Sequence, residues 1–510
     1  MLPPKKVISA KTTPRCQENQ EPFIEANEIL TPALENFHKT LAGCRSKKLG
    51  DWDVSPIRDF SCLFENYPGD IPEGISNWNT SNVENMEKIF FNCKGKIPNL
   101  NKWDTRKVRN MSWAFSGSEI RTTKKICDSW NTISLKVMIG AFSNCKLLET
   151  FNCKWNTSKV IEMSSLFSGC SLLKNFCPWF NTINVESMAH MFQDCSSLVA
   201  LNLPFITSCV TTMAHMFDSC SCLKKIEMES FNTAKVHRFS YMFAHCGRLE
   251  EIFTGPGFVD EWGFDMTGMF LDCAKIVSPP ISKFRLNDAF TVESMFEGCE
   301  SAIYFFTEKT TMLQVRYAKN MFRNCSSMIK LPIQNWNTRS LTDASGMFYG
   351  CKSLVELDCG HINTENITDL SYMFAGCKKL SKVDMSNFDL RNAVNMAGMF
   401  EDCISLTSLD FRNANQLGFD SLDYFTFMFA GCLSLSTIRT RLNYIPTNEF
   451  SLTGMTDECV SMMAGAEGEV LPLPPVAVNP RPQNSEEEES EIDSCVIELF
   501  REIEKKKENK

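Results

Sequence analysis

The sequence predicts one elongated α/β solenoid, a right-handed stack of about 15 coils that each contain a strand and a short helix or helical turn, with a curved or superhelical course. Fifteen Phe residues recur at steps of 25 to 29 residues, and thirteen of them are followed three residues later by Cys. Period-2 apolar stretches follow many of these pairs. Because one such unit is too small to bury its own apolar face, the units must stack. The 510 residues therefore form one array rather than three or four separate domains.

The N-terminal residues 1–48 are polar, with eight Lys or Arg against five Glu, and we expect a flexible basic arm. The solenoid is predicted over residues 49–465, with its first and last repeats as caps that shield the core. Asp51-Trp52-Asp53-Val54 and Phe60 to Phe64 begin the first, atypical repeat.

The coil that begins at Phe180-Asn181-Thr182 illustrates the unit. Its apolar positions from Val185 to Cys195 fall at i, i+3, i+6, i+7 and i+10, which predicts a helix of two to three turns. Thr at the start of this segment is a candidate N-cap. The alternating stretch Leu198–Leu203 predicts a short strand.

The repeated Phe and Cys are expected to form a buried structural ladder, since free Cys packs as a small hydrophobe. Zinc sites use closely spaced pairs of ligands, whereas each coil offers one inward Cys, so disulfides and metal binding are the less favoured alternatives. No cofactor and no metal site is expected. The ladder residues in the most regular coils are Phe192, Cys195, Phe217, Cys220, Phe348, Cys351, Phe374, Cys377, Phe400 and Cys403. The Asn-Thr pairs form a second ladder, which we expect to bond backbone groups within and between coils.

Stacking geometry predicts curvature. Parallel strands repeat at about 4.8 Å and packed helices at about 9 Å. This mismatch predicts an arc or a superhelix, with the strands on the concave face as the docking surface.

The units around Trp78-Asn79-Thr80-Ser81-Asn82-Val83-Glu84-Asn85-Met86 and Val383-Asp384-Met385-Ser386-Asn387-Phe388-Asp389 resemble the BspA-like leucine-rich-repeat surface proteins, with their mycoplasma-type repeats of about 25 residues. The resemblance covers roughly residues 50 to 460. It implies a leucine-rich-repeat-like solenoid that binds proteins or surfaces, often displayed on cells.

Three groups of polar or irregular residues are candidates for a specific role. Asp358, Asp384 and Asp410 share one position on adjacent strands, as solvated or turn-capping carboxylates or as a docking site for a basic partner. His190 and His215 share another position and are interpreted as stacked surface histidines, because no acidic partner shares their phase. The stretches 253–264, 279–290 and 304–317 lose the Trp-Asn-Thr signature, either through drift or as a binding bulge.

The C-terminal end differs in composition. Residues 466–484 form a Pro-rich linker, and residues 485–510 an acidic amphipathic helix that caps the solenoid, docks on a partner or self-associates through residues 490–504.

Location and partners follow from composition. The net charge of −9 disfavours nucleic acid as a partner, and no apolar run is long enough for a transmembrane segment. The N-terminal 21 residues lack the apolar core of a secretory signal, and many unpaired thiols suit a reducing compartment, so an intracellular, cytoplasmic location is expected. A cell-surface or virion location is the alternative.

Repeated positions do not bring unlike groups together, and no enzyme motif is present, so the chain is expected to be non-enzymatic. The predicted function is a repeat scaffold for protein–protein interaction through the concave face, with protein partners that the sequence does not identify. A surface or virion structural protein that mediates adhesion is the alternative.

Overall fold

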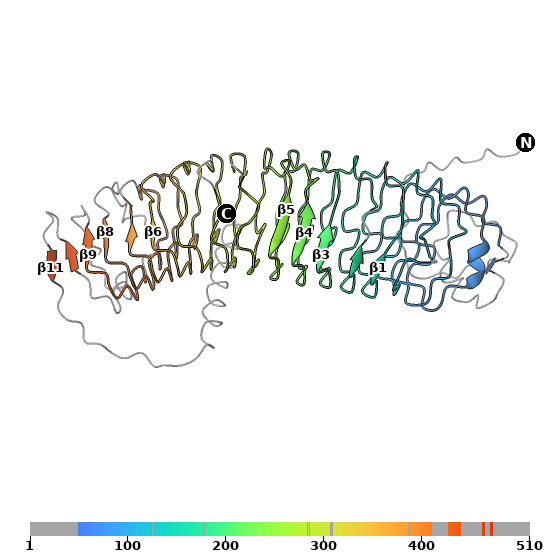
Figure 1. Ribbon diagram of the computed structural model, residues 1–510, viewed down its shortest axis with the longest axis horizontal. Coiled ribbons are helices and arrows are strands. Elements are labelled where there is room, and N and C mark those ends of the chain that lie inside the picture. Colours follow the sequence, from blue (N-terminus) through green and yellow to red (C-terminus); the bar gives the residue numbers. More distant parts are fainter. Residues whose placement is uncertain are drawn as a thin grey trace, which may run out of the picture. The chain divides into compact units, whose positions relative to one another are not determined.

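The computed structural model describes residues 49–410, apart from 51, 125, 177–178, 283, 285, 307–309 and 386–387, together with 427–439, 462–464 and 470–472 (Figure 1). The chain divides into two compact units, Met1–Leu471 and Pro472–Lys510. The described coils belong to the first unit. The predicted N-terminal arm and C-terminal helix lie outside the described residues.

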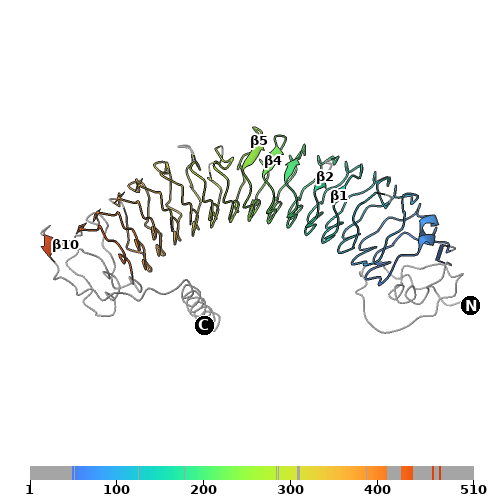
Figure 2. The ribbon, with the colours of Figure 1, turned by 60° about the horizontal axis from the view of Figure 1, so that its bottom comes forward.

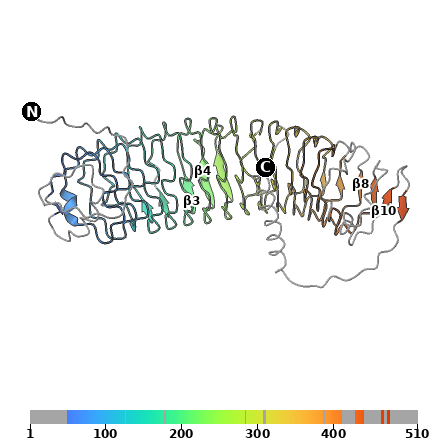
Figure 3. The same cartoon turned by 180° about the vertical axis from the view of Figure 1, so that it is seen from behind.

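Short parallel strands run along one side of the stack (Figure 3). They form four sheets, β1-β2, β3-β4-β5, β6-β7 and β8-β9-β10-β11. From β1 to β10, each paired strand lies parallel to the strand of the next coil, whereas β11 follows β10 after only a few residues. In the central sheet Leu201, Ile226 and Ile252 lie in register. The bounds are β1 Thr150–Phe151, β2 Asn175–Phe176, β3 Ala200–Asn202, β4 Lys225–Met228, β5 Glu251–Thr254, β6 Glu356–Leu357, β7 Lys382–Val383, β8 Ser408–Asp410, β9 Thr437–Arg439, β10 Met462–Ala464 and β11 Val470–Pro472.

Strand pairing extends past the predicted end of the solenoid at residue 465. Strand β11 lies within the segment 466–484 that was predicted to be a linker, and it is a neighbour of β10 in the last sheet. The rest of that segment lies outside the described residues.

The predicted short helices are wrong. The described residues contain no α-helix, and the labelled helical element is the 3-10 helix η2, Glu73–Asn77. In the coil that was expected to be helical, the N–H groups of Met191 and Cys195 close three-residue turns on the carbonyls of Met188 and Phe192. These turns place an apolar side chain inward every third residue, the same spacing as the face of a helix.

The intervening N–H groups of this segment bond to the next coil instead. Met188, His190 and Phe192 donate to the carbonyls of residues 212, 214 and 216. In a helix, every interior N–H group would bond to a carbonyl group of its own coil. The turns therefore form a second parallel ladder, which we call the turn ladder. It runs from Asp59 to Asn395 through isolated bridges between neighbouring coils, such as the bridge between Ser187 and Thr212.

Because the second ladder consists of turns rather than helices, the expected difference between strand spacing and helix spacing disappears. A smaller difference in spacing between the two sides of each coil remains, so that each coil is wedge-shaped. Ring centroids of one coil and the next lie 6.3 Å apart for Phe205 and Phe231 near the strands. They lie 5.4 Å apart for Phe217 and Phe243 in the core, and 4.8 Å apart at the turn ladder, where the stacked residues are His215 and Tyr241.

The narrow side of each wedge is thus the turn ladder. Within the first unit, the coloured coils follow an arc in Figure 2, with the arrows of β4 and β5 towards its outer edge. The expectation that the strands line the concave face is therefore wrong for these coils, because the turn ladder lies there.

The Phe-Cys ladder forms the core, and all ten ladder residues predicted above have no exposed surface. Neighbouring rings stack, as between Phe348 and Phe374 at 5.6 Å. Each Cys donates its S–H to the Phe carbonyl of the preceding coil, as Cys195 does to Phe167 at 3.2 Å. Burial raises the pKa of these thiols, to about 12 for Cys246.

The Asn-Thr ladder bonds within and between coils as the sequence predicted. Asn181 Oδ1 accepts the N–H of Ile183 in its own turn at 3.2 Å. Thr182 Oγ1 donates to the carbonyl of Ile206 in the next coil at 2.9 Å. Thr182 therefore joins coils, and it does not cap a helix.

Candidate binding groove

A groove of about 630 Å³ lies on the turn-ladder face and crosses six coils, from His190 to Tyr317. Its lining residues flank the bridges from Ser187 to Tyr317 that hold this ladder together. The parallel bridges of the turn ladder fix the backbone under these side chains. The groove is therefore positioned by the regular part of the fold.

An aromatic row forms the C-terminal half of the groove. The rings of Phe264 and Phe290 stack at 5.0 Å with an interplanar angle of 7°, and Tyr317 meets Phe290 edge to face at 5.3 Å. Phe264 is 52% exposed and Tyr317 37%. The Arg316 guanidinium lies 5.4 Å from the Phe290 ring centroid, within the range of a cation–π interaction.

The aromatic row coincides with the stretches in which the repeat signature is lost. Phe264, Phe290 and Tyr317 are the last residues of the three stretches that lose the Trp-Asn-Thr signature. The stretches had been interpreted as drift or as a binding bulge. The structure shows an aromatic row on three successive coils, with its first and last rings exposed and the middle ring half-buried. It shows no bulge away from the stack at the bridged positions, which keep their register.

Carboxylates lie beside the aromatic row. Burial raises the pKa of Glu293, and the nearby negative charges of Asp343 and Asp265 raise it further, while Lys319 acts in the opposite direction. Asp265 accepts the N–H of Thr267 at 3.1 Å. Among the described residues, no hydrogen bond or ion pair reaches the Glu293 carboxylate.

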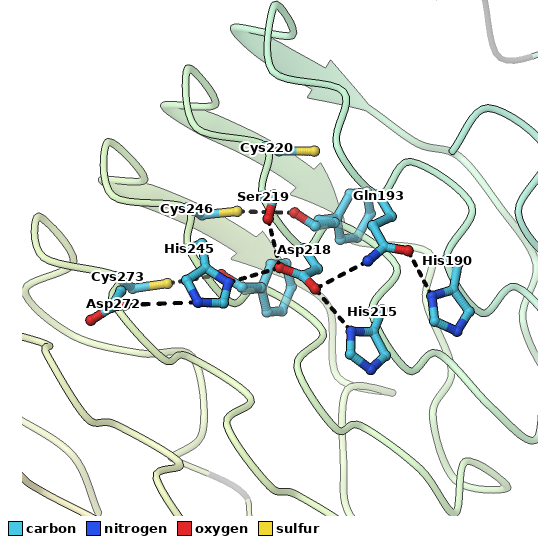
Figure 4. A network of polar contacts seen from close by, with 12 residues as sticks. His190, Gln193, His215, Asp218, Ser219, Cys220, His245, Cys246, Asp272 and Cys273 are labelled. Atoms are coloured by element: carbon cyan, nitrogen blue, oxygen red, sulfur yellow. Dashed lines mark hydrogen bonds and ion pairs between the residues drawn. The ribbon is translucent and has the colours of Figure 1, made fainter. Parts of the chain in front are cut away.

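A histidine network borders the N-terminal half of the groove (Figure 4). His190 and His215 stack at 4.7 Å and 8°, and their rings line the groove. Asp218 lies between His215 and His245 and accepts a hydrogen bond of 2.9 Å from the Nδ1 atom of each. Ser219 also donates to this carboxylate, at 3.0 Å.

Asp218 corrects the sequence interpretation of the two histidines as simply stacked. An acidic partner does exist, three residues after His215, and it is 6% exposed. Burial would raise its pKa, but the hydrogen bonds from the imidazoles and from Ser219 outweigh burial and lower it. The signal in the sequence was the spacing His-x-x-Asp within one turn, rather than a shared phase between coils.

The three predicted docking carboxylates lie away from this groove, on the strand side. Asp358 and Asp384 are both close to Gly360, since a Cβ atom built there would lie 3.2 Å from an oxygen of each. Asp358 also accepts the N–H of Gly360 at 3.1 Å, which makes it a turn cap. Asp410 is in register with Arg439 of β9.

Two properties of the described residues bear on metals and membranes. No cluster of three or more His, Cys, Asp or Glu side chains suited to a metal ion occurs within the described ranges. Nor does this part of the chain contain a helix with the length and apolar character needed to span a membrane.

The family described as "Mycoplasma protein of unknown function, DUF285" matches six overlapping segments, residues 33–120, 114–203, 180–255, 202–308, 258–327 and 316–439. The chain belongs to this family. Together the segments cover residues 33–439, which contain the whole groove. No curated protein matches the chain.

Several solved structures share a partial likeness with this family member. A leucine-rich repeat protein from Eubacterium ventriosum is 14% identical, with 62% of this chain and 84% of that chain covered and a TM-score of 0.24. TLR13 in its complex with ssRNA13 is 12% identical, with 78% and 76% covered and a TM-score of 0.22. The Toll–Spatzle complex of Drosophila is 12% identical, with 60% and 50% covered and a TM-score of 0.20.

Proposed function

We propose that the chain is a non-enzymatic, leucine-rich-repeat-like scaffold that binds another protein through the groove on its turn-ladder face. The observation that carries the proposal is the aromatic row inside this groove, in which Phe264 and Tyr317 are exposed and Phe290 is half-buried. Exposed apolar patches rimmed by polar groups mark interaction sites, and rigid aromatic side chains are frequent anchors in protein interfaces. The parallel bridges of the turn ladder hold the row in place before binding, which lowers the entropic cost of association.

The polar groups of the groove support a binding role over catalysis. Asp218 holds His215 and His245 through their Nδ1 atoms, which resembles the orienting half of a catalytic relay. The neighbouring hydroxyl of Ser219 donates to the same carboxylate and not to an imidazole. The network therefore stiffens the wall of the groove.

An intracellular location belongs to this proposal and rests on the thiols. Most of the described cysteines are buried in the core as thiols, among them Cys195, Cys246 and Cys351. Such a ladder needs no oxidising compartment to form. Surface or virion adhesion remains the alternative proposal, and it uses the same groove.

Site-specific photo-crosslinking tests the binding role. A benzophenone side chain at Phe264 is expected to form a defined protein adduct in extracts of the source organism, and Phe290→Ala should reduce that adduct. The same probe at Trp179 is the matched control, because this side chain is 59% exposed and lies outside the groove. Equal adducts from both positions, or none from Phe264, would contradict the proposal.

A further inference from the structure

The charges in the groove are separated along the stack. Arg238 lies at the N-terminal end together with His190 and His215, and Asp265 and Glu293 lie beside the aromatic row. A partner that fills the groove must meet a cation and imidazoles towards one end, and rings with carboxylates beside them towards the other. Long-range complementarity of this kind fixes the orientation of a bound segment.

We infer that the groove takes an extended peptide segment of a partner protein, which runs across the coils and places a Lys or Arg side chain beside Glu293 and Asp265. An apolar or aromatic residue of the segment packs against Phe264, and an acidic residue faces Arg238. The inference rests on the proposed function and names the class of ligand.

The Glu293 carboxylate supplies the first reason. It is partly buried between Asp265 and Asp343, and among the described residues it has neither a hydrogen bond nor an ion pair. The nearby Lys319 is exposed, and the described residues contain no ion pair between it and Glu293. A cationic side chain from a partner would relieve the repulsion among the three carboxylates, and a charge-assisted hydrogen bond there is stronger than a neutral one.

The aromatic row supplies the second reason. The chain itself already places a guanidinium over one of its rings, that of Arg316 over Phe290. Arg and Lys stems pack well on such rings while their charged groups reach neighbouring carboxylates. The combination of rings and carboxylates on adjacent coils therefore favours a cation with an apolar stem over an anionic ligand such as nucleic acid.

The length of the groove supplies the third reason. Six coils at about 4.8 Å leave five steps, or roughly 24 Å, between the first and the last. An extended chain covers this length with about seven residues at about 3.3 Å each. A short extended segment thus spans the groove, whereas a single small molecule would reach only one end.

Selection from a displayed library of random heptapeptides tests the inference on the full chain. Peptides selected on the wild type are expected to be enriched in Lys or Arg at one position, and Glu293→Lys should reverse that preference to Asp or Glu. Glu293→Gln should weaken the binding of a selected fluorescent peptide at least tenfold in a polarisation titration, without lowering the melting temperature. Glu186→Lys is the matched control, because this exposed carboxylate lies on the same face but outside the groove lining.

The outcomes separate the two proposals. Peptides that lose binding with Phe264→Ala but show no preference for Lys or Arg would overturn the inference and leave the binding role standing. Peptides that bind equally well to Phe264→Ala would contradict the groove as a binding site. Displacement of a selected peptide by a synthetic peptide of residues 1–20 would assign the groove to the chain's own basic N-terminal segment and overturn the assignment to a separate partner.

Discussion

Gly268 offers a quantitative test of how the coils stack. Its φ of +57° lies in the left-handed region, and a Cβ atom built there would lie 2.6 Å from ring atoms of Tyr241 in the preceding coil. Gly268→Ala therefore adds two costs. The left-handed conformation costs an Ala residue about 1–2 kcal/mol, and overpacking against the ring adds about 1–3 kcal/mol.

Two further variants separate these costs. Gly376 has a φ of +70°, but a Cβ atom there would meet its nearest atoms at an ordinary 3.4 Å. Gly376→Ala is therefore expected to carry the conformational cost alone. In a Tyr241→Ala background the ring is absent, so that Gly268→Ala should cost about as much as Gly376→Ala.

The measurement is the free energy of unfolding from urea titrations of the four variants and the wild type, with hydrogen exchange near residue 268 as a local readout. The reasoning is refuted if Gly268→Ala costs no more than Gly376→Ala. It is also refuted if the extra cost persists when Tyr241 is removed.

Three other predictions concern the network, the thiols and the strand face. Because the folded pKa of Asp218 is lowered, its contribution to stability is present above its unfolded pKa and is lost as pH falls through the folded value. The melting-temperature difference between wild type and Asp218→Asn should therefore shrink as pH falls below about 4, and a difference that stays constant from pH 4.5 down to 2.5 would contradict this. Under native conditions a thiol reagent should label Cys62, Cys209 and Cys222 well before the buried ladder cysteines. After denaturation all described thiols should be labelled at similar rates. Fast labelling of native Cys246, whose pKa is raised to about 12, would show that the ladder opens. If the strand-side carboxylates dock a basic partner, substitution of Asp358, Asp384 and Asp410 by Lys should weaken the binding of the isolated partner at least tenfold in a titration. Unchanged affinity would mean that Asp358 acts only as a turn cap.

Most of the fold could be predicted from the periodicity of the sequence. The recurrence of Phe and Cys predicted a stack with these residues inside, and Phe348 and Cys351 are fully buried as expected. Periodicity could not distinguish a helix from consecutive turns, because both place apolar residues three positions apart. The distinguishing signal was the residue type at the left-handed positions, where His190 and Asp194 have φ values of 59° and 58° and other coils have Gly.

The groove was less visible in the sequence than the fold. The loss of the repeat signature marked the stretches that end in Phe264, Phe290 and Tyr317, but it did not show that these rings share one face. The side chains that share this face depend on which N–H groups bond to the next coil, and the turns determine that. Asp218 was missed for a related reason, because its partner His245 is brought to it by stacking and lies 27 residues away in the sequence.

The hydrogen bonds between coils also determine how a chain of this kind can change in length. Every inter-coil bond joins residues about one repeat apart, as between Phe192 and Met216 or between Cys195 and Phe167. Duplication or removal of one whole repeat therefore restores every donor to an equivalent acceptor, whereas a change of half a repeat would leave both ladders unpaired. The array can lengthen by whole coils while the groove, which six particular coils build, keeps its own shape.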